Sequence, residues 1–581
     1  MYWVESTLFW NDIARGTPLE VLLQRTPTPP HSYQRHTSPI MLRNPSLPVG
    51  LDMIRKKMIK VGGCVHALAM EPLWWKDEQD PRDQNASAFP HQAGNLYSNP
   101  SFLRVLQTYV RDSRFNTSST PKPLAIVAAL DVSHVQATVL CAKSSGLQIR
   151  IRSGGHDFEG MSYVSSVPFV ILDMFNLRSI NIDIPSETAW VQAGATLGEL
   201  YYDIAEKSKV HGFPAGVCLT VGTGGHFSGG GYGNMIRKYG LSIDHIIDAQ
   251  VVDANGKVLN RKTMGEDFFW AIRGGGAASF CVVLAWKIKL VRVPDVITVF
   301  EVQETLEERA TDIVLQWQQI APKIDSRLFI RAQPAIHFLQ NGNRSVNVTF
   351  IGLYLGRTRP LVSLMNKSFP LLGLQAQDCI EMSWVESNLF WNGIPRGTPL
   401  EVLSKRTPAA PHKYTKYKSD YVKTPIPKEG LEMIWKKMID VGVFMLMQWN
   451  PYGGRMSEVP ENATAFPHRA GNLFKMLYIT IWEEESAEAM SKNIKATRDL
   501  YDTFTPFVSR NPTEAFLNYR DIDIGTNSDG SLDFALDFFK GNVKRLLQVK
   551  AKVDPTNFFQ YEQSIPIVKL NSETASEWSA I

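Results

Sequence analysis

The sequence has little of what several classes of protein require. Among its 581 residues there are only five cysteines, and no two are spaced as CxxC, which argues against a zinc site or a thioredoxin-type motif. No uninterrupted apolar run reaches the roughly 18 residues of a membrane helix, so we expect no membrane segment. The net charge is only +4 and the basic residues are scattered. We therefore expect neither a nucleic-acid face nor a polybasic membrane patch.

Signals for the compartment conflict. The start, MYWVESTLFWND, lacks the basic stretch and apolar core of a signal peptide. Sequons of the form N-x-S/T would suit a secreted glycoprotein, although chance alone produces several in a chain of this length. They lie at Asn85, Asn116, Asn343, Asn347, Asn366 and Asn462.

What the sequence does contain is one long internal repeat. WVESTLFWNDIARGTPLEVL from Trp3 returns as WVESNLFWNGIPRGTPLEVL from Trp384, and AFPHQAGNLY later matches AFPHRAGNLF. Residues 1–97 are thus a partial duplicate of residues 384–474. Such a fragment lacks the partners that would bury its apolar faces, so we do not expect it to fold as a separate domain. A gene fusion or a mis-joined gene model explains it more simply than a regulatory appendage does.

From Pro121 onward the spacing of apolar residues indicates an α/β domain. PLAIVAAL is typical of a strand, and DVSHVQATVLCAKSSG of a helix with an Asp N-cap and a closing Gly. We expect Thr196 to cap a second helix and Asn255-Gly256 to turn a hairpin. After about Asp295, helical patterns alternate with strand-like runs such as VNVTFIGLYL and KMLYITIW, which predicts a second domain of α+β type.

Two glycine-rich loops form the candidate site. RSGGHDFEG, from Arg152, presents a histidine directly after a predicted strand, and GFPAGVCLTVGTGGHFSGGGYGNM, from Gly212, holds nine glycines and one cysteine. Such glycine density costs backbone entropy, so a large bound cofactor is the natural candidate to order the second loop. RGGGAASF, from Arg273, could add a nest for a pyrophosphate. Neither of the last two fits GxGxxG opening a helix, which argues against a Rossmann fold.

These loops, together with AWVQAGATLGELYY, EDFFWAIRGGGAASF and KVDPTNFFQYEQSIP, resemble plant berberine bridge enzyme-like proteins, within the vanillyl-alcohol oxidase type of flavoprotein. The resemblance covers about residues 102–567. It implies an α+β fold with a PCMH-type (vanillyl-alcohol oxidase-like) FAD-binding domain at 118–294 and an α/β substrate-binding domain with an antiparallel sheet at 295–530. A C-terminal segment at 531–570 is expected to contact FAD.

The resemblance implies FAD attached through two covalent bonds, one from His156 and one from Cys218. Both residue types are able nucleophiles toward an oxidised flavin ring, although each alone would ordinarily be a capped loop histidine or a buried inert cysteine. The other positions that the resemblance assigns to the cofactor are Arg152, Ser153, Gly154, Gly155, Gly222, Gly225, His226, Gly229 and Gly230.

For catalysis, the resemblance implies Tyr232 as the base, helped by Lys475 and Tyr519. The pKa of a free phenol must fall from about 10 to about 8 for the phenol to be substantially ionised near pH 8. A neighbouring ammonium could lower the pKa by that much. Val221 matches a position whose small side chain leaves dioxygen access to the flavin. Taken alone, a tyrosine among glycines is more often packing than catalysis.

Two positions depart from the family pattern. Phe158 stands where tyrosine is frequent, and Leu477 stands where glutamine or glutamate is frequent, so we expect a more apolar pocket that favours an aromatic alcohol over a sugar. The alkaloid ring-closing reaction is not expected, because its glutamate is missing. Cys141 matches one half of a family disulfide whose partner region is replaced by the repeat, and we expect Cys141 to be unpaired.

The leading hypothesis is therefore an oxidase that passes hydride from a small alcohol, of phenylpropanoid or monolignol type or a carbohydrate, to bicovalent FAD, with O2 giving H2O2. A non-catalytic or misfolded product of a tandem-gene fusion is one alternative, and an oligosaccharide oxidase is another. By resemblance we expect a monomeric protein secreted to the cell wall or apoplast. The expected partners are the alcohol and O2, with no nucleic acid, membrane or metal.

Overall fold

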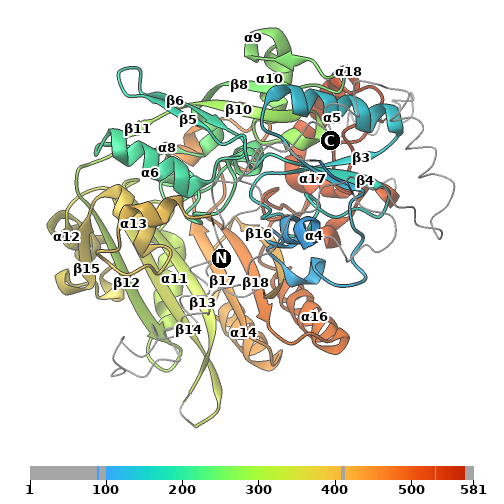
Figure 1. The fold of residues 1–581 in the computed structure, drawn as a ribbon. Helices are drawn as coiled ribbons and strands as arrows, with labels where there is room; N and C mark the ends of the chain where they lie inside the picture. The colour runs from blue at the N-terminus through green and yellow to red at the C-terminus, as the bar shows by residue number, and fades with distance from the viewer. Residues whose placement is uncertain (1–87, 91–99, 340, 407–412, 530–531, 569–581) are drawn as a thin grey trace, which may run out of the picture.

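The structure is a computed structural model, shown in Figure 1, and it describes residues 88–90, 100–339, 341–406, 413–529 and 532–568. Within these ranges no helix has the length and apolar character needed to cross a membrane. Most of the predicted segment 1–97 lies outside them. From that segment only strand β1 (Ala88–Pro90) is described, and its backbone pairs with β2 (Ala125–Ala128).

A first sheet begins the region that the resemblance predicts to bind FAD, called the FAD-binding region below. Its order is β1-β2-β4-β3, in which β2, β4 (Phe169–Asp173) and β3 (Gln148–Arg152) run parallel. Helix α5 (Val132–Ser145) connects β2 to β3, as parallel pairing requires. The Asp131 carboxylate accepts hydrogen bonds from two amides of its first turn, and Gly146 closes it with φ +65°. Both predicted caps of this helix are confirmed.

A second, antiparallel sheet lies beside the first, and the glycine-rich segments that begin at Gly212 and Arg273 lie between its strands, whereas the loop at residues 152–160 follows β3 of the first sheet. Thr196 and Glu199 form a capping box at the start of α6 (Leu197–Lys207), and the predicted hairpin turns at Gly256, with φ +73°. In sheet order the strands are β5 (Ile180–Asp183), β6 (Thr188–Gln192), β10 (Val282–Lys289), β8 (Ile246–Val252) and β9 (Val258–Leu259).

The second half of the chain forms a seven-stranded sheet in which all neighbours are antiparallel. Trp317, Trp449 and Phe474 pack ring against ring in its core. Helices α11 (Ala310–Ile320), α14 (Lys428–Asp440) and α16 (Ala487–Phe504) cover one face, and the other face turns toward the FAD-binding region (Figure 1). In order the strands are β15 (Cys379–Met382), β12 (Ile297–Thr305), β14 (Arg344–Tyr354), β13 (Leu328–Phe338), β17 (Met445–Pro451), β18 (Phe474–Trp482) and β16 (Tyr414–Val422).

The C-terminal segment returns to the FAD-binding region, where α18 (Val543–Val553) packs against α10 (Glu266–Ile272) and α17 (Asp533–Phe539) (Figure 1). The buried Lys550 ammonium joins the regions by donating to the Ser279 carbonyl at 2.7 Å. The predicted α+β class is confirmed. The remaining longer helices are α4 (Pro100–Gln107), α7 (Thr223–Ser228), α12 (Thr358–Ser368) and α13 (Trp384–Phe390), and the one-turn helices are α8 (Ile236–Tyr239), α9 (Arg261–Met264) and α15 (Arg455–Glu458). The short strands β7 (His211–Gly212) and β11 (Val291–Arg292) pair with each other.

The state of Cys141 corrects one expectation. Cys141 is disulfide-bonded, so the prediction that it is unpaired is wrong. Its partner is none of the free cysteines in the described ranges, which are Cys218, Cys281 and Cys379. The prediction failed because sequence context was used to reject a pairing that depends only on the distance between two side chains.

Candidate active site

A cavity lies between the glycine-rich segments and the seven-stranded sheet. The FAD-binding region lines it with residues 153–158, 216–218 and 276–278, among others, and the sheet lines it with side chains of β13, β16, β17 and β18. The predicted site residues that line this one cavity are Ser153, Gly154, Gly155, His156, Phe158, Cys218, Val221, Gly222, Gly225, His226, Gly229, Tyr232, Leu477 and Tyr519.

Three predicted site residues do not line the cavity. Arg152 is fully buried in an ion pair with Asp173 at 2.6 Å and also donates to two carbonyls near the end of α4. It supports the end of β3, and its role as a cofactor contact stays a prediction. Gly230 lies against the Phe516 ring, and Lys475 sits behind Tyr232.

The two loops that carry His156 and Cys218 meet backbone to backbone. A Cβ built on Gly154 would lie 2.3 Å from the amide nitrogen of Gly222, and one on Gly222 would lie 2.0 Å from the Ser153 hydroxyl. Only glycine permits this approach. The glycines are therefore needed first to bring the loops together.

One hydroxyl lies next to both candidate nucleophiles. Thr220 Oγ1 is 2.9 Å from His156 Nε2 and 4.0 Å from Cys218 Sγ. Burial, and after it the positive charge of Arg111, hold the pKa of His156 well below its ordinary value. The imidazole is therefore neutral, which is its nucleophilic form.

His226 supports the cysteine loop from behind. Its Nε2 accepts a hydrogen bond from the Gly216 amide at 2.9 Å. Burial, and then the Lys475 charge, lower the pKa of His226 to about 3, so this nitrogen keeps its lone pair at any physiological pH. Asn518 in turn donates to the His226 carbonyl at 2.8 Å.

The hydroxyl of Tyr232 belongs to a buried polar group at the cavity. It donates to Asn450 Oδ1 at 2.5 Å, and Arg331 donates to the same oxygen at 2.7 Å and to the Tyr232 hydroxyl at 3.4 Å. Sequence reasoning missed Arg331 and Asn450. The available signal was a charged or amide residue inside an otherwise apolar strand run, as in LFIRAQPAIHF and MLMQWNP.

Lys475 lies against the ring of Tyr232 and not at its hydroxyl. Its Nζ lies over three ring faces, 3.7 Å from the Tyr232 centroid, 3.8 Å from Phe516 and 4.1 Å from Tyr519. It has no hydrogen-bond partner among the described residues, and burial followed by the charge of Arg331 lowers its pKa well below the ordinary value.

The cation at the Tyr232 hydroxyl is Arg331. Burial raises the pKa of Tyr232 above its ordinary value, and the charge and hydrogen bond of Arg331 oppose that rise. The expectation that the lysine ammonium lowers the phenol pKa is therefore replaced by a role for the guanidinium, which stays charged inside proteins.

The outer wall of the cavity is apolar and aromatic. Phe158 stacks on Tyr417, with centroids 3.8 Å apart and planes 17° apart, and on Tyr519 at 5.6 Å and 15°. Leu477, with Ile479 and Ile481 at alternate positions of β18, continues this wall. Phe158 and Leu477 thus lie in an apolar stretch of the cavity wall, and their part in a substrate pocket stays a prediction.

The residues present fit FAD. Gly225 leaves open space where a side chain would stand, glycine backbone lines much of the cavity, and a free thiol and a neutral imidazole open onto it. Backbone amides without side chains suit a pyrophosphate, and the two nucleophiles suit an electrophilic ring.

Comparisons with known proteins agree with this fit. The family model "FAD binding domain" matches residues 123–261, and the model "Berberine and berberine like" matches residues 515–566. The chain is 55% identical to berberine bridge enzyme-like 4 of Arabidopsis thaliana over 478 residues, 81% of this chain and 90% of the relative. It is 56% identical to berberine bridge enzyme-like 3 of the same plant over 473 residues, 80% and 88% of the two chains.

Solved structures show the same likeness. BBE-like #28 from Arabidopsis thaliana aligns with a TM-score of 0.77 and 43% identity, covering 81% of this chain and 97% of that one. Phl p 4, a grass pollen allergen with glucose dehydrogenase activity, aligns with a TM-score of 0.76 and 41% identity over 81% and 96%. A variant of berberine bridge enzyme aligns with a TM-score of 0.78 and 35% identity over 82% and 96%.

Proposed function

Because the chain belongs to the berberine bridge enzyme-like family of FAD-binding oxidoreductases, we propose that it oxidises a small alcohol of phenylpropanoid type and passes the electrons to O2, forming H2O2. The observation that carries this proposal is that His156, Cys218 and Tyr232, far apart in the sequence, line one cavity. That cavity combines groups able to hold a flavin with a phenol able to take a proton.

Bound FAD supplies a hydride acceptor at the site. In the proposal, the neutral imidazole of His156 and the thiol of Cys218 hold it covalently, and Thr220 orients both side chains. The test is acid precipitation of the purified protein. Flavin that stays with the precipitate, and peptides carrying flavin mass at both His156 and Cys218, are expected. Free flavin in the supernatant would refute the attachment.

In the proposed reaction Tyr232 removes the proton of the substrate hydroxyl. Asn450 holds the phenol oxygen in place, and Arg331 stabilises the phenolate, since its guanidinium donates to that oxygen. Once the hydroxyl proton has gone, the alkoxide can release hydride from the adjacent carbon. Val221 leaves room at the cavity wall for dioxygen, as we propose from the family pattern.

The substrate class follows from the wall around Phe158. Stacked rings and aliphatic side chains desolvate well against an aromatic ring, whereas a sugar would lose hydrogen bonds to water there. A carbohydrate oxidase is the second candidate, favoured by the glucose dehydrogenase activity of one structural relative and by the Gln448 side chain at the cavity. Peroxide release measured over aromatic alcohols, mono- and oligosaccharides distinguishes them, and peroxide from sugars alone would overturn the aromatic reading.

Secretion to the cell wall or apoplast is part of the proposal. Among the sequons, Asn343, Asn366 and Asn462 are exposed, whereas Asn347 is buried in β14. A loss of mass on glycosidase treatment of the plant protein, mapped to the exposed asparagines, supports secretion. A non-catalytic fusion product stays the alternative. Transcripts that fail to span the codons for residues 95–99 would show that the fusion is an artefact of the gene model, and would remove that alternative.

A further inference from the structure

Three aromatic rings from three distant segments form a single stack at the cavity wall. Phe158 stacks on Tyr417 and on Tyr519, and these three residues follow β3, lie on β16 and precede α17. No backbone pairing joins the three segments to one another within the described residues. Something else must hold their rings at stacking distance.

Each ring stands one or two residues from a member of a buried ion triad. Glu159 follows Phe158, Lys416 precedes Tyr417, and Asp521 lies two residues after Tyr519. The Lys416 ammonium contacts Glu159 Oε1 at 2.7 Å and Asp521 Oδ1 at 2.7 Å.

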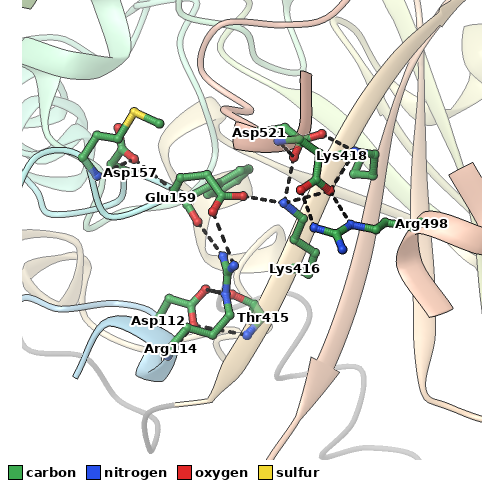
Figure 2. A network of polar contacts seen from close by, with 12 residues as sticks. Asp112, Arg114, Asp157, Glu159, Thr415, Lys416, Lys418, Arg498 and Asp521 are labelled. Atoms are coloured by element: carbon green, nitrogen blue, oxygen red, sulfur yellow. Dashed lines mark hydrogen bonds and ion pairs between the residues drawn. The ribbon is translucent and has the colours of Figure 1, made fainter. Parts of the chain in front are cut away.

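Figure 2 shows Lys416 between these two carboxylates, with Arg114 on the far side of Glu159. The exposed fraction of the Lys416 side chain is 2%, and those of Glu159 and Asp521 are 4% and 3%.

A second layer fixes the same loop. Arg114 donates to Glu159 at 3.3 Å and to the carbonyl of Phe158 at 2.9 Å. Asp157 is paired with Arg520 at 3.2 Å. The charges of the network balance. Its acidic members are Asp112, Glu159, Asp521 and Asp523, and its basic members are Arg114, Lys416, Lys418 and Arg498.

Such a network is a poor source of stability. Desolvating each buried ion offsets most of its attraction, so apolar residues of similar volume would stabilise the fold as well or better. Its directional contacts do fix distances between segments. Burial disfavours the charge of Lys416, but Asp521 and Glu159 raise its pKa above the ordinary value, so the ammonium stays charged.

We propose that Lys416 is a positioning residue for substrate: through Glu159 and Asp521 it sets the stack of Phe158, Tyr417 and Tyr519 against which the aromatic ring of the alcohol packs. This inference rests on the proposed function, and it adds how the enzyme selects the aromatic ring of its substrate. Lys416 touches neither flavin nor substrate in this scheme, and its effect passes through the rings.

The test compares Lys416→Met with Lys418→Met. Both lysines are buried on the same face of β16 and both contact Asp521, but in the described part of the chain Lys418 pairs with Asp523 and not with Glu159. The substrates are cinnamyl alcohol and allyl alcohol, which differ by the aromatic ring.

We expect Lys416→Met to raise KM for cinnamyl alcohol about three- to tenfold, the size of one aromatic contact, with KM for allyl alcohol and the rate of flavin reduction nearly unchanged. Lys418→Met should leave the ratio of the two KM values as in the wild type, and Lys416→Arg should restore it. Equal changes for both alcohols, or equal effects of both lysine variants, would overturn the proposal.

Cinnamamide, which has the ring but no alcohol to oxidise, separates this inference from the proposed function. Its binding, followed by the flavin absorbance, should weaken three- to tenfold in Lys416→Met and not in Lys418→Met. Unchanged binding overturns the inference even if alcohols are oxidised, and a wild type that oxidises no alcohol overturns the proposed function instead. If Lys416→Met does not fold, Glu159→Gln takes its place. It removes the charge of Glu159, keeps the shape of the side chain and should weaken cinnamamide binding in the same way.

Discussion

At the residue scale, the Thr220 hydroxyl is the contact that relates the two candidate attachment residues. It lies 2.9 Å from His156 Nε2 and 4.0 Å from Cys218 Sγ. We expect Thr220→Val to lower the fraction of protein whose flavin is linked at both residues, because the imidazole loses the partner that fixes its orientation. Thr220→Ser keeps the hydroxyl and should behave as the wild type.

Mass spectrometry of flavin-bearing peptides measures that fraction directly, without turnover. Full double attachment in Thr220→Val would show that loop packing around Gly154 and Gly222 is sufficient to orient both side chains.

Tyr232 and Arg331 carry the second prediction. Tyr232→Phe should lower the rate of flavin reduction about 10²- to 10⁴-fold, the usual contribution of a general base, while leaving FAD bound. Since Arg331 favours the phenolate, Arg331→Met should move the rising limb of the pH–rate profile to higher pH. Stopped-flow measurement of the rate of flavin reduction across pH follows both effects. An unchanged pH–rate profile in Arg331→Met would show that Arg331 does not stabilise the phenolate.

Only some of these residues could be predicted from the sequence. His156, Cys218 and Tyr232 sit in glycine-rich motifs with a recognisable local pattern, so they could be predicted. Arg331 and Asn450 lie 99 and 218 residues from Tyr232 in the chain, and only the folded sheet brings them to its hydroxyl. Lys475 was predicted as a neighbour, but which part of the phenol it faces depends on side-chain direction, which motif matching does not give.

At the element scale, the sequence predicted those contacts that join residues close together in the chain. The Asp131 and Thr196 caps and the Gly256 turn depend on neighbours in sequence, and each was predicted. Strand β16 shows the limit. Its alternation of Lys416, Tyr417 and Lys418 is typical of a strand with one solvated face, yet every residue of β16 is buried, because counter-ions arrive from residues 159 and 521.

Helix α17 contains a buried carboxyl group, that of Asp537, which makes the free energy of unfolding depend on pH. Burial, with the charges of Asp533 and Glu514, raises the pKa of Asp537 to about 7 against a hydrogen bond from Thr513. The folded state therefore binds this proton more tightly than the unfolded chain, and the free energy of unfolding falls as pH rises from about 4 to about 7.

We expect Asp537→Asn, which removes that titration, to raise Tm at pH 8 and to leave Tm nearly unchanged at pH 4. Thermal unfolding at the two pH values measures this. Asp502→Asn makes the same chemical change at an exposed position and serves as the control. A gain of equal size at both pH values would contradict the assignment.

At the scale of the whole molecule, the two halves are held together by contacts that no local pattern predicts. Arg469, between β17 and β18, pairs with Asp244 of the FAD-binding region at 2.7 Å across 225 residues of sequence. Motif resemblance predicted the α+β class and the antiparallel sheet, but not which buried ions join the halves. The cavity exists only when both halves are folded, since each supplies part of its lining.

This arrangement predicts that FAD stabilises both halves together. The double variant His156→Ala, Cys218→Ala should bind FAD reversibly, so the cofactor can be removed and added back. Adding FAD well above its Kd should raise Tm by several degrees in one cooperative transition, because a ligand that binds only the folded state shifts unfolding by mass action. Scanning calorimetry with and without FAD measures this. A transition that splits, with only the part containing residues 123–261 responding to FAD, would show that the seven-stranded sheet folds independently of the cofactor and that the cavity is not the element coupling the two halves.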